Sequence, residues 1–436
     1  MMKLSNVNFG IIAFIFTLSF FKGILVLVGI SETITQLLIE GMIVLLLASA
    51  SFHILQTRKL IAPVFLINLI LIVFIFISFL LTDVNKIQLI IFIRKFFLYY
   101  LFFYSLYNIY LEDIHKEKLK KLIIYLFILQ IIASWIKLFF IGRAENFIGT
   151  LSITEGSIAT IMPLFAIVYL LSNYLVYRKN KYIYWIFLFV SIGLISNKMG
   201  IIFYIGLLYI FLIYIYTRSY YIFVNTAFIK KILLNSIYFL VLFSLFVSLN
   251  PRANPEGVVG GSVDIEYLIS YSKEYQTLDT RKAIGIEGDG RFDAPFVAFD
   301  RMSTGGMLNI LFGFGPGELV KSSYTKYKKP LLEKYHIGYG GRIGLVWVMM
   351  QIGLIGLVLF LLFHIFLFLR MKKLYNNINN NKDRVYIMTF LGISIVYFLD
   401  FFSYSPSMIL NPALVLVYFY IYYYIDTYKQ GVELNE

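Results

Sequence analysis

Apolar runs of roughly membrane-spanning length follow one another along most of this chain, and they constrain its fold more than any other feature. A helix needs about 20 predominantly apolar residues to cross the hydrocarbon core of a bilayer. Of all residues 60% are hydrophobic and 14% are charged, whereas about a quarter are charged in soluble proteins. The runs also lack the two-residue alternation of a membrane β-barrel. The sequence therefore predicts an all-α polytopic membrane protein.

We expect twelve membrane-spanning helices, nine before and three after a mostly polar segment. The expected helix cores are 9–29, 34–55, 61–81, 88–110, 121–141, 156–172, 183–197, 199–216, 232–249, 343–369, 385–400 and 408–425. The seventh and eighth cores are short and meet at Asn197-Lys198, so one bent unit there would give eleven spans. The chain divides into residues 1–249 with nine helices, a long external loop at 250–342, and residues 343–436 with three helices and the C-terminal tail. The first run lacks a small-residue cleavage site, so we expect it to be retained.

The basic residues of the short loops predict the orientation. Loops after the second, fourth, sixth, eighth and tenth runs hold 17 lysines and arginines, and the other short loops hold three. Because basic loops stay in the cytoplasm, both termini are expected there and the long loop outside. The net charge of +14 thus reflects topology rather than nucleic-acid binding. The absence of cysteine excludes disulfides and thiolate metal sites.

Arginines in the long loop could bind phosphate groups at the membrane surface. Arg291 and Arg301 flank residues 293–300, whose aromatic and aliphatic side chains suit a short helix lying on the bilayer. Such a helix would hold both guanidinium groups at headgroup depth, where they can bind phosphate through paired hydrogen bonds. Arg281 and Arg342 are further candidates in the same loop. The plainer alternative is that these arginines are solvated and paired with carboxylates.

A glycine-rich turn and one histidine follow in the loop. The stretch Phe312-Gly-Phe-Gly-Pro-Gly317 permits a tight turn whose backbone can closely approach other groups. It lacks the Gly-Lys-Ser/Thr ending and the preceding strand of a nucleotide-binding loop. His336 is the only histidine of the loop, and an imidazole can accept a proton from a sugar hydroxyl near neutral pH. A single loop histidine is more often merely exposed.

Cations inside the membrane form another group of candidates. Arg94 and Lys95 lie about eight residues inside the fourth span, where an unpaired cation costs a few kcal/mol. They should therefore face a cavity or an anionic partner, or extend to the headgroups. Lys198 is placed similarly between the seventh and eighth spans. Three carboxylates near external span ends could pair with these cations: Glu40, Glu155 and Asp400. Three histidines on the cytoplasmic side receive no functional assignment: His53, His115 and His364.

This arrangement resembles the superfamily of bacterial O-antigen polymerases (Wzy-type) and O-antigen ligases. The similarity rests on Gly290-Arg291 in a late external loop, the Phe-Gly-x-Gly-x-Gly turn at 312–317, His336, and a Gly-Leu-Ile-Gly-Leu run at 353–357. The turn at 196–200, Ser-Asn-Lys-Met-Gly, is similar to the family's Ser-Arg/Lys-x-Gly turn. In the family Asn often follows the histidine, whereas Ile337 follows it here.

The resemblance implies a GT-C-like architecture and metal-independent, cofactor-free glycosyl transfer on the outer face of the bacterial cytoplasmic (inner) membrane. Implied substrates are glycans linked to undecaprenyl diphosphate, and implied partners are membrane lipids, a chain-length regulator and a flippase. His336, or failing it a carboxylate of the loop, would deprotonate the attacking hydroxyl, and Arg291 would stabilise the charge that develops on the leaving diphosphate. The diphosphate-binding residues implied by the resemblance are Arg301, Arg342, Lys198 and Arg281 for the donor, with Arg94 and Lys95 for the acceptor.

The acceptor and the class of protein leave alternatives open. A polymerase would transfer the glycan to another lipid-linked repeat unit, and a ligase would transfer it to lipid A-core. The abundance of Phe and Tyr favours the polymerase, since such polymerases are commonly rich in these residues. A lipid or polysaccharide transporter would also have many spans and buried cations, but it usually consists of two related halves, unlike a division into nine and three helices.

Overall fold

The computed structural model describes residues 2–142, 149–151, 158–196, 198, 200–219, 237, 240–241, 243–251, 253–276, 291, 293–320, 334–335, 343–378, 380–403, 409 and 411–433. Its helices are α1 (Met2–Leu27), α2 (Glu32–Thr57), α3 (Phe65–Leu80), α4 (Lys86–Asn108), α5 (Asp113–Ile141), α6 (Ile158–Tyr177), α7 (Lys181–Ile195), α8 (Gly200–Ser219), α10 (Ile265–Gln276), α12 (Ala294–Thr304), α13 (Met307–Phe312), α15 (Gly344–Asn376), α16 (Asn381–Ser403) and α18 (Pro412–Glu433). These described residues form no strand, which confirms the predicted helical fold for this part of the chain.

Eight of the described helices are long and apolar enough to cross a membrane, namely α1, α2, α4, α5, α6, α8, α15 and α16. Helices α3 and α7 are apolar but shorter. Described helices occupy eleven of the twelve predicted cores. Within the ninth core, 232–249, the described residues are 237, 240–241 and 243–249, and they are helical. The chain is thus a multi-pass membrane protein, while the number of twelve spans stays a prediction.

The seventh and eighth predicted spans form two helices rather than one. Helix α7 ends at Ile195 and α8 begins at Gly200. A Cβ atom on Gly193 would lie only 2.7 Å from Cγ2 of Ile201, so the two helices touch closely where they meet. The small glycine permits this contact, which a larger side chain would prevent.

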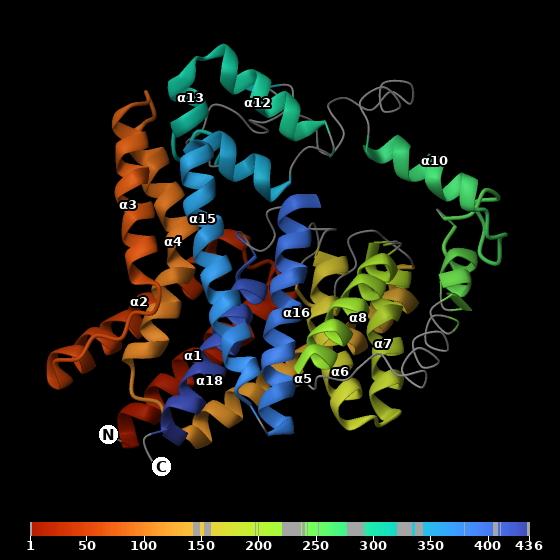
Figure 1. Ribbon diagram of the computed structural model, residues 1–436, viewed down its shortest axis with the longest axis horizontal. Helices are drawn as coiled ribbons and strands as arrows, with labels where there is room; N and C mark the ends of the chain where they lie inside the picture. The colour runs from red at the N-terminus through yellow and green to blue at the C-terminus, as the bar shows by residue number, and fades with distance from the viewer. Residues whose placement is uncertain are drawn as a thin grey trace.

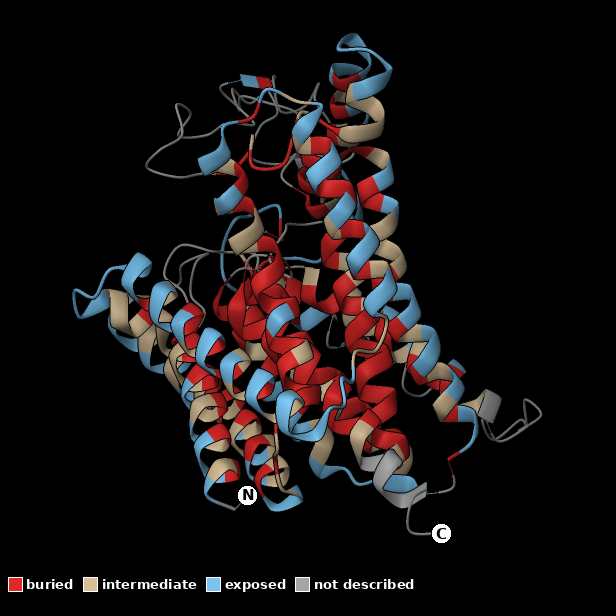
Figure 2. Ribbon diagram, turned by 90° about the vertical axis from the view of Figure 1, so that its left-hand side faces the viewer, coloured by how far each residue is buried: buried red, intermediate tan, exposed pale blue. Residues whose placement is uncertain are grey.

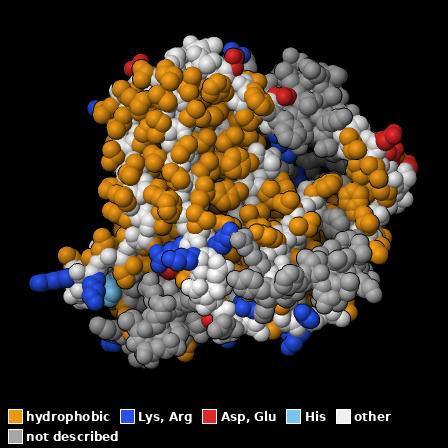
Figure 3. Space-filling view, viewed as in Figure 1, with side chains coloured by type: hydrophobic (Ala, Val, Ile, Leu, Met, Phe, Trp, Pro, Cys, Tyr) orange, Lys and Arg blue, Asp and Glu red, His pale blue; other side chains and the backbone are white. Residues whose placement is uncertain are grey.

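Both chain termini lie at one end of the helix bundle, and α12 and α13 cross the opposite end (Figure 1). We call the first of these the terminal end; α5 and α16 begin there. There the Oγ atom of Ser5 lies 2.7 Å from Nδ1 of His115, and Lys382 lies 3.5 Å from Glu117. Much of the surface over α3, α4 and α15 between the two ends is hydrophobic, as expected for helices in lipid (Figure 3).

Aromatic side chains fill the centre of the bundle, where α4, α15, α16 and α18 meet. Buried residues concentrate on these central helices and exposed ones on the outer helices (Figure 2). The fully buried His364 lies in this core, with Nε2 3.0 Å from the hydroxyl of Tyr397 and 3.4 Å from that of Tyr100. Aromatic pairs of this kind add about 0.5–1.5 kcal/mol each beyond their burial. The histidine therefore contributes to the packing of four helices.

Candidate functional site

Helix α12, at Ala294–Thr304, forms where the sequence predicts a short surface helix at residues 293–300. Its buried residues Ala294, Ala298 and Met302 recur every four positions, so one face packs against α13 and α15. Phe296 is 77% exposed on another face. An exposed aromatic side chain on a short helix that crosses the end of a membrane bundle fits the interface between headgroups and hydrocarbon.

The two arginines of this region lie at opposite ends of α12. Arg291 precedes the helix and is half-buried, whereas Arg301 lies in the last turn and is exposed. The helix has 11 residues, which corresponds to about 16 Å at 1.5 Å per residue. The arrangement thus presents one guanidinium group at each end of a surface helix rather than a pair side by side.

Helix α15 is broken at Ile352-Gly353, and the glycine-rich turn fits into the break. We call residues 312–317 together with 351–353 the glycine junction. Gly353 has φ 66° and ψ −175°, and Gly313 has φ 78°. A Cβ atom on Gly353 would lie 2.1 Å from the carbonyl oxygen of Leu311, and one on Gly313 would lie 2.6 Å from the carbonyl carbon of Gln351. Only glycine fits both conformation and space at these positions.

Three hydrogen bonds hold the glycine-rich turn in place at the break in α15. The backbone N–H of Phe314 donates to the carbonyl of Met350 at 2.8 Å. The N–H of Gly317 donates to Oε1 of the fully buried Gln351 at 3.2 Å. Ser78 of α3 donates its hydroxyl to the carbonyl of Phe312 at 2.8 Å. Irregular backbone at membrane depth is stable only where protein satisfies it in this way.

The glycine junction confirms the predicted close-approach turn and shows what it approaches. Gly317 faces α4, where a Cβ atom would lie 2.3 Å from the carbonyl oxygen of Gln88. The turn therefore docks onto helices of this chain. It also brings together two stretches of the sequence, 312–317 and 353–357, that are separate motifs in the chain.

A second contact ties the segment just before His336 to the junction. The ring of Tyr335 stacks on Phe314 with centroids 4.7 Å apart, and Lys334 forms an ion pair with Glu318. Burial lowers the pKa of Lys334 from its usual range. Three predicted site residues lie outside the described residues, so their predicted roles remain predictions: His336, Arg342 and Arg281.

Five charged residues gather on α1, α2 and α4, in the halves of these helices farther from the terminal end. This charged cluster consists of Lys22, Glu32, Glu40, Arg94 and Lys95. Nε of Arg94 lies 3.3 Å from the carboxylate of Glu40, and Lys22 lies 2.6 Å from that of Glu32. Lys95 is half-buried and close enough to interact electrostatically with the other four. Glu40, one of the three carboxylates named from the sequence as partners for the membrane cations, is thus paired with Arg94. Three cations against two carboxylates leave the cluster with a positive excess.

The two ion pairs of the charged cluster should differ in energy. Side-chain exposure is 8% for Glu40 and 58% for Glu32. We expect Glu40→Gln to lower the free energy of unfolding by about 2 kcal/mol, less than the 3–5 kcal/mol of a fully buried pair, because Arg94 is partly exposed. Glu32→Gln should cost less than about 1 kcal/mol. Denaturant unfolding of both variants in detergent micelles checks this, and equal losses would contradict it.

Lys198 lies between α7 and α8, half-buried, with its backbone N–H donating to the carbonyl of Gly193 at 2.8 Å.

On the face seen in Figure 3, basic side chains line part of a hollow between the upper end of α16 and α10. The hollow is at the end of the bundle that α12 crosses. An anionic group entering there would meet positive charge.

Sequence reasoning did not find the break in α15. Its signal is the Gly353-Leu-Ile-Gly356 spacing, which reads equally well as a continuous apolar helix, because single glycines are common in membrane helices. It also did not find the cavity beside α5 described below, whose lining comes from five separate helices. The break thus has only an ambiguous signature in the sequence, and the cavity has none.

No protein-family model matches the chain, and comparison with the curated proteins finds no similar sequence. In the part of the chain that the structure describes, the fold is that of an all-α, multi-pass membrane protein, with α15 broken at Ile352-Gly353 and with Arg301 in the last turn of the short helix α12.

Proposed function

We propose that this protein is a glycosyltransferase that polymerises oligosaccharide repeat units linked to undecaprenyl diphosphate on the outer face of the cytoplasmic membrane. The glycine junction is the observation that supports this most. The resemblance rests partly on the turn at 312–317 and the run at 353–357, and these two stretches meet in direct contact. The contact is made through Gly353, the first residue of the second stretch, which packs against Leu311 and Phe312.

The junction also gives the motifs a physical purpose. It fixes α13 to the break in α15, and α12 packs on both helices. Arg291 leads directly into α12, so a rigid junction would hold its guanidinium group in a constant place relative to the membrane surface. Preorganised positive charge of this kind lowers the barrier of a reaction in which negative charge develops.

In the proposed reaction a hydroxyl oxygen of the acceptor sugar attacks C1 of the donor glycan. The bond between C1 and the diphosphate oxygen breaks, and the electron pair leaves with the diphosphate. Arg291 stabilises that charge, and His336 takes the hydroxyl proton. The positive excess of the charged cluster suits the diphosphate of the acceptor, with Lys95 and Arg94 as its contacts.

Deleting the gene in the native host and separating its surface glycans on a gel tests the function. A polymerase predicts that the ladder of long chains collapses to a core that bears one repeat, and that a plasmid copy restores the ladder. Loss of all attached glycan with accumulation of lipid-linked polymer would instead identify a ligase. An unchanged ladder would refute both and favour the transporter.

A further inference from the structure

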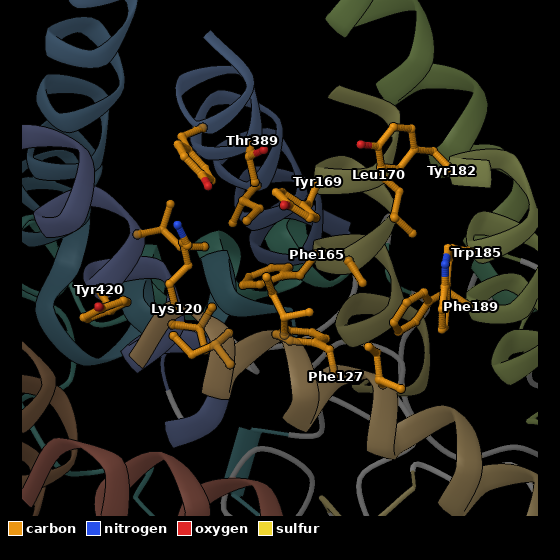
Figure 4. A pocket seen from close by; sticks show the side chains of 18 of the residues that line it. Lys120, Phe127, Phe165, Tyr169, Leu170, Tyr182, Trp185, Phe189, Thr389 and Tyr420 are labelled. Atoms are coloured by element: carbon orange, nitrogen blue, oxygen red, sulfur yellow. The ribbon is translucent and has the colours of Figure 1, made fainter. Parts of the chain in front are cut away.

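A cavity of about 300 Å³ lies between α5, α6, α7, α16 and α18, toward the terminal end of the bundle. Phe127 and Phe165 occupy its middle, with Lys120 on one side and Trp185 on the other (Figure 4). On α5 its lining runs from Lys120 to Ile128, about 12 Å along the helix axis. Its volume is at the lower end of the range for ligand pockets, and its wall is almost entirely apolar.

One side of the cavity, between α5 and α7, faces out of the helix bundle. Farther from the terminal end, α5 and α7 are joined by a hydrogen bond from Nε1 of Trp135 to Oγ of Ser191 at 3.0 Å. The cavity begins below this bond, where Ile124 and Ile128 of α5 are half-buried and Trp185 of α7 is 37% exposed. The surroundings of an apolar membrane helix are lipid chains, so the cavity opens toward hydrocarbon and not toward water.

The end of the cavity nearest the terminal end is cationic and rich in tyrosine. Nζ of Lys120 lies 5.0 Å from the ring centroids of both Tyr386 and Tyr424 and 3.2 Å from the Tyr424 hydroxyl. Lys120 is also ion-paired with Glu117. Lys181 at the same rim is exposed, and the ion pairs among the described residues do not include it. Arg178 and Lys179 of the α6–α7 turn add two further exposed cations.

We propose that this cavity binds one anionic phospholipid of the leaflet at the terminal end, with an acyl chain between α5 and α7 and its phosphate on Lys181 and Arg178. The apolar wall matches the chain, and the cationic rim matches the headgroup. On the orientation predicted from the loop charges this is the cytoplasmic leaflet, where anionic lipids concentrate. The proposal rests on the cavity and its charges alone, and it does not depend on glycosyl transfer.

Trp185 provides a direct probe of occupancy. The full-length protein is reconstituted in phosphatidylcholine vesicles that contain brominated phosphatidylglycerol or, at the same mole fraction, brominated phosphatidylcholine. The fluorescence that depends on Trp185 is the difference between the wild type and Trp185→Phe. We expect the Trp185 fluorescence to be quenched by the anionic lipid at a lower mole fraction than by phosphatidylcholine. The ratio should be about fivefold for each rim cation that contacts the anionic headgroup. Trp135, exposed on α5 beyond the cavity, should show little preference.

Three variants distinguish a specific lipid-binding site from a general electrostatic attraction of anionic lipid to the protein. Lys181→Gln should reduce the preference at Trp185 about fivefold, whereas Lys121→Gln removes the same charge from an exposed residue that does not line the cavity and should leave it unchanged. Ala166→Phe fills the cavity and should abolish the preference of the Trp185 quenching for the anionic lipid. Equal quenching by both lipids, or equal effects of the two lysine variants, would overturn the proposal. The lysine variants alter exposed side chains, so they remain decisive if Ala166→Phe fails to fold.

Discussion

Gly353→Ala is expected to destabilise the protein by about 2 kcal/mol more than Gly306→Ala, and to reduce the surface polymer in proportion to the loss of folded protein. Gly306 has φ 91° and ψ 177°, and Gly353 has φ 66° and ψ −175°. Both conformations belong to a region that only glycine occupies readily, so each substitution pays a similar backbone strain of about 1–3 kcal/mol. The two variants therefore differ mainly in the space around the new methyl group.

That space is open at Gly306 and closed at Gly353. A Cβ atom on Gly306 meets no atom within 4 Å, whereas on Gly353 it would lie 2.1 Å from the backbone oxygen of Leu311. Backbone cannot move aside as a flexible side chain can, so the glycine junction must open. Loss of the contact between Phe314 and Met350 would then leave backbone groups unsatisfied at membrane depth.

Unfolding midpoints of purified protein in detergent, with Gly10→Ala as a second control in open space, measure this difference. Equal destabilisation by Gly353→Ala and Gly306→Ala would mean that the turn and the break in α15 do not depend on their mutual contact. In that case the glycine junction would no longer support the functional proposal.

Arg291→Ala is expected to reduce polymer formation by at least about 100-fold at unchanged protein level, because loss of one preorganised charge-stabilising donor typically costs that much. Arg291→Lys keeps the charge but not the planar fork that binds phosphate with two hydrogen bonds, so it should restore only part of the activity. Arg301→Ala should have a smaller effect, since Arg301 is exposed at the far end of α12. Surface-glycan gels with immunoblots of the protein provide the measurement.

The same position reports the orientation of the chain. The protein contains no cysteine, so Arg291→Cys introduces a unique thiol. An impermeant thiol reagent added to intact cells should label it. Labelling only after disruption of the membrane would place α12 in the cytoplasm, and full activity of Arg291→Ala would remove this residue from the mechanism.

The amino-acid sequence by itself predicted the apolar helices, the membrane class of the protein and the short helix α12, but not α10 or α13. An apolar run of about 20 residues in a membrane forms a helix, because every backbone N–H and C=O group must be hydrogen-bonded within its own segment. The cost of a charge in lipid likewise predicted that Arg94 would face a cavity or an anionic partner, or extend to the headgroups, and in the structure it is paired with Glu40. These conclusions depend on local composition and on the energetics of the bilayer.

Only the tertiary structure decided where the glycine turn docks, that α15 is broken, and that a cavity with a cationic rim lies between five helices. Each of these features joins segments that are far apart in the chain. Gly313 and Gly353 look like flexible residues in the sequence, and their need for glycine arises from backbone atoms of the other segment. The physical reason is that a steric limit or an unfilled space depends on both surfaces in contact. The sequence of one segment alone therefore cannot predict it.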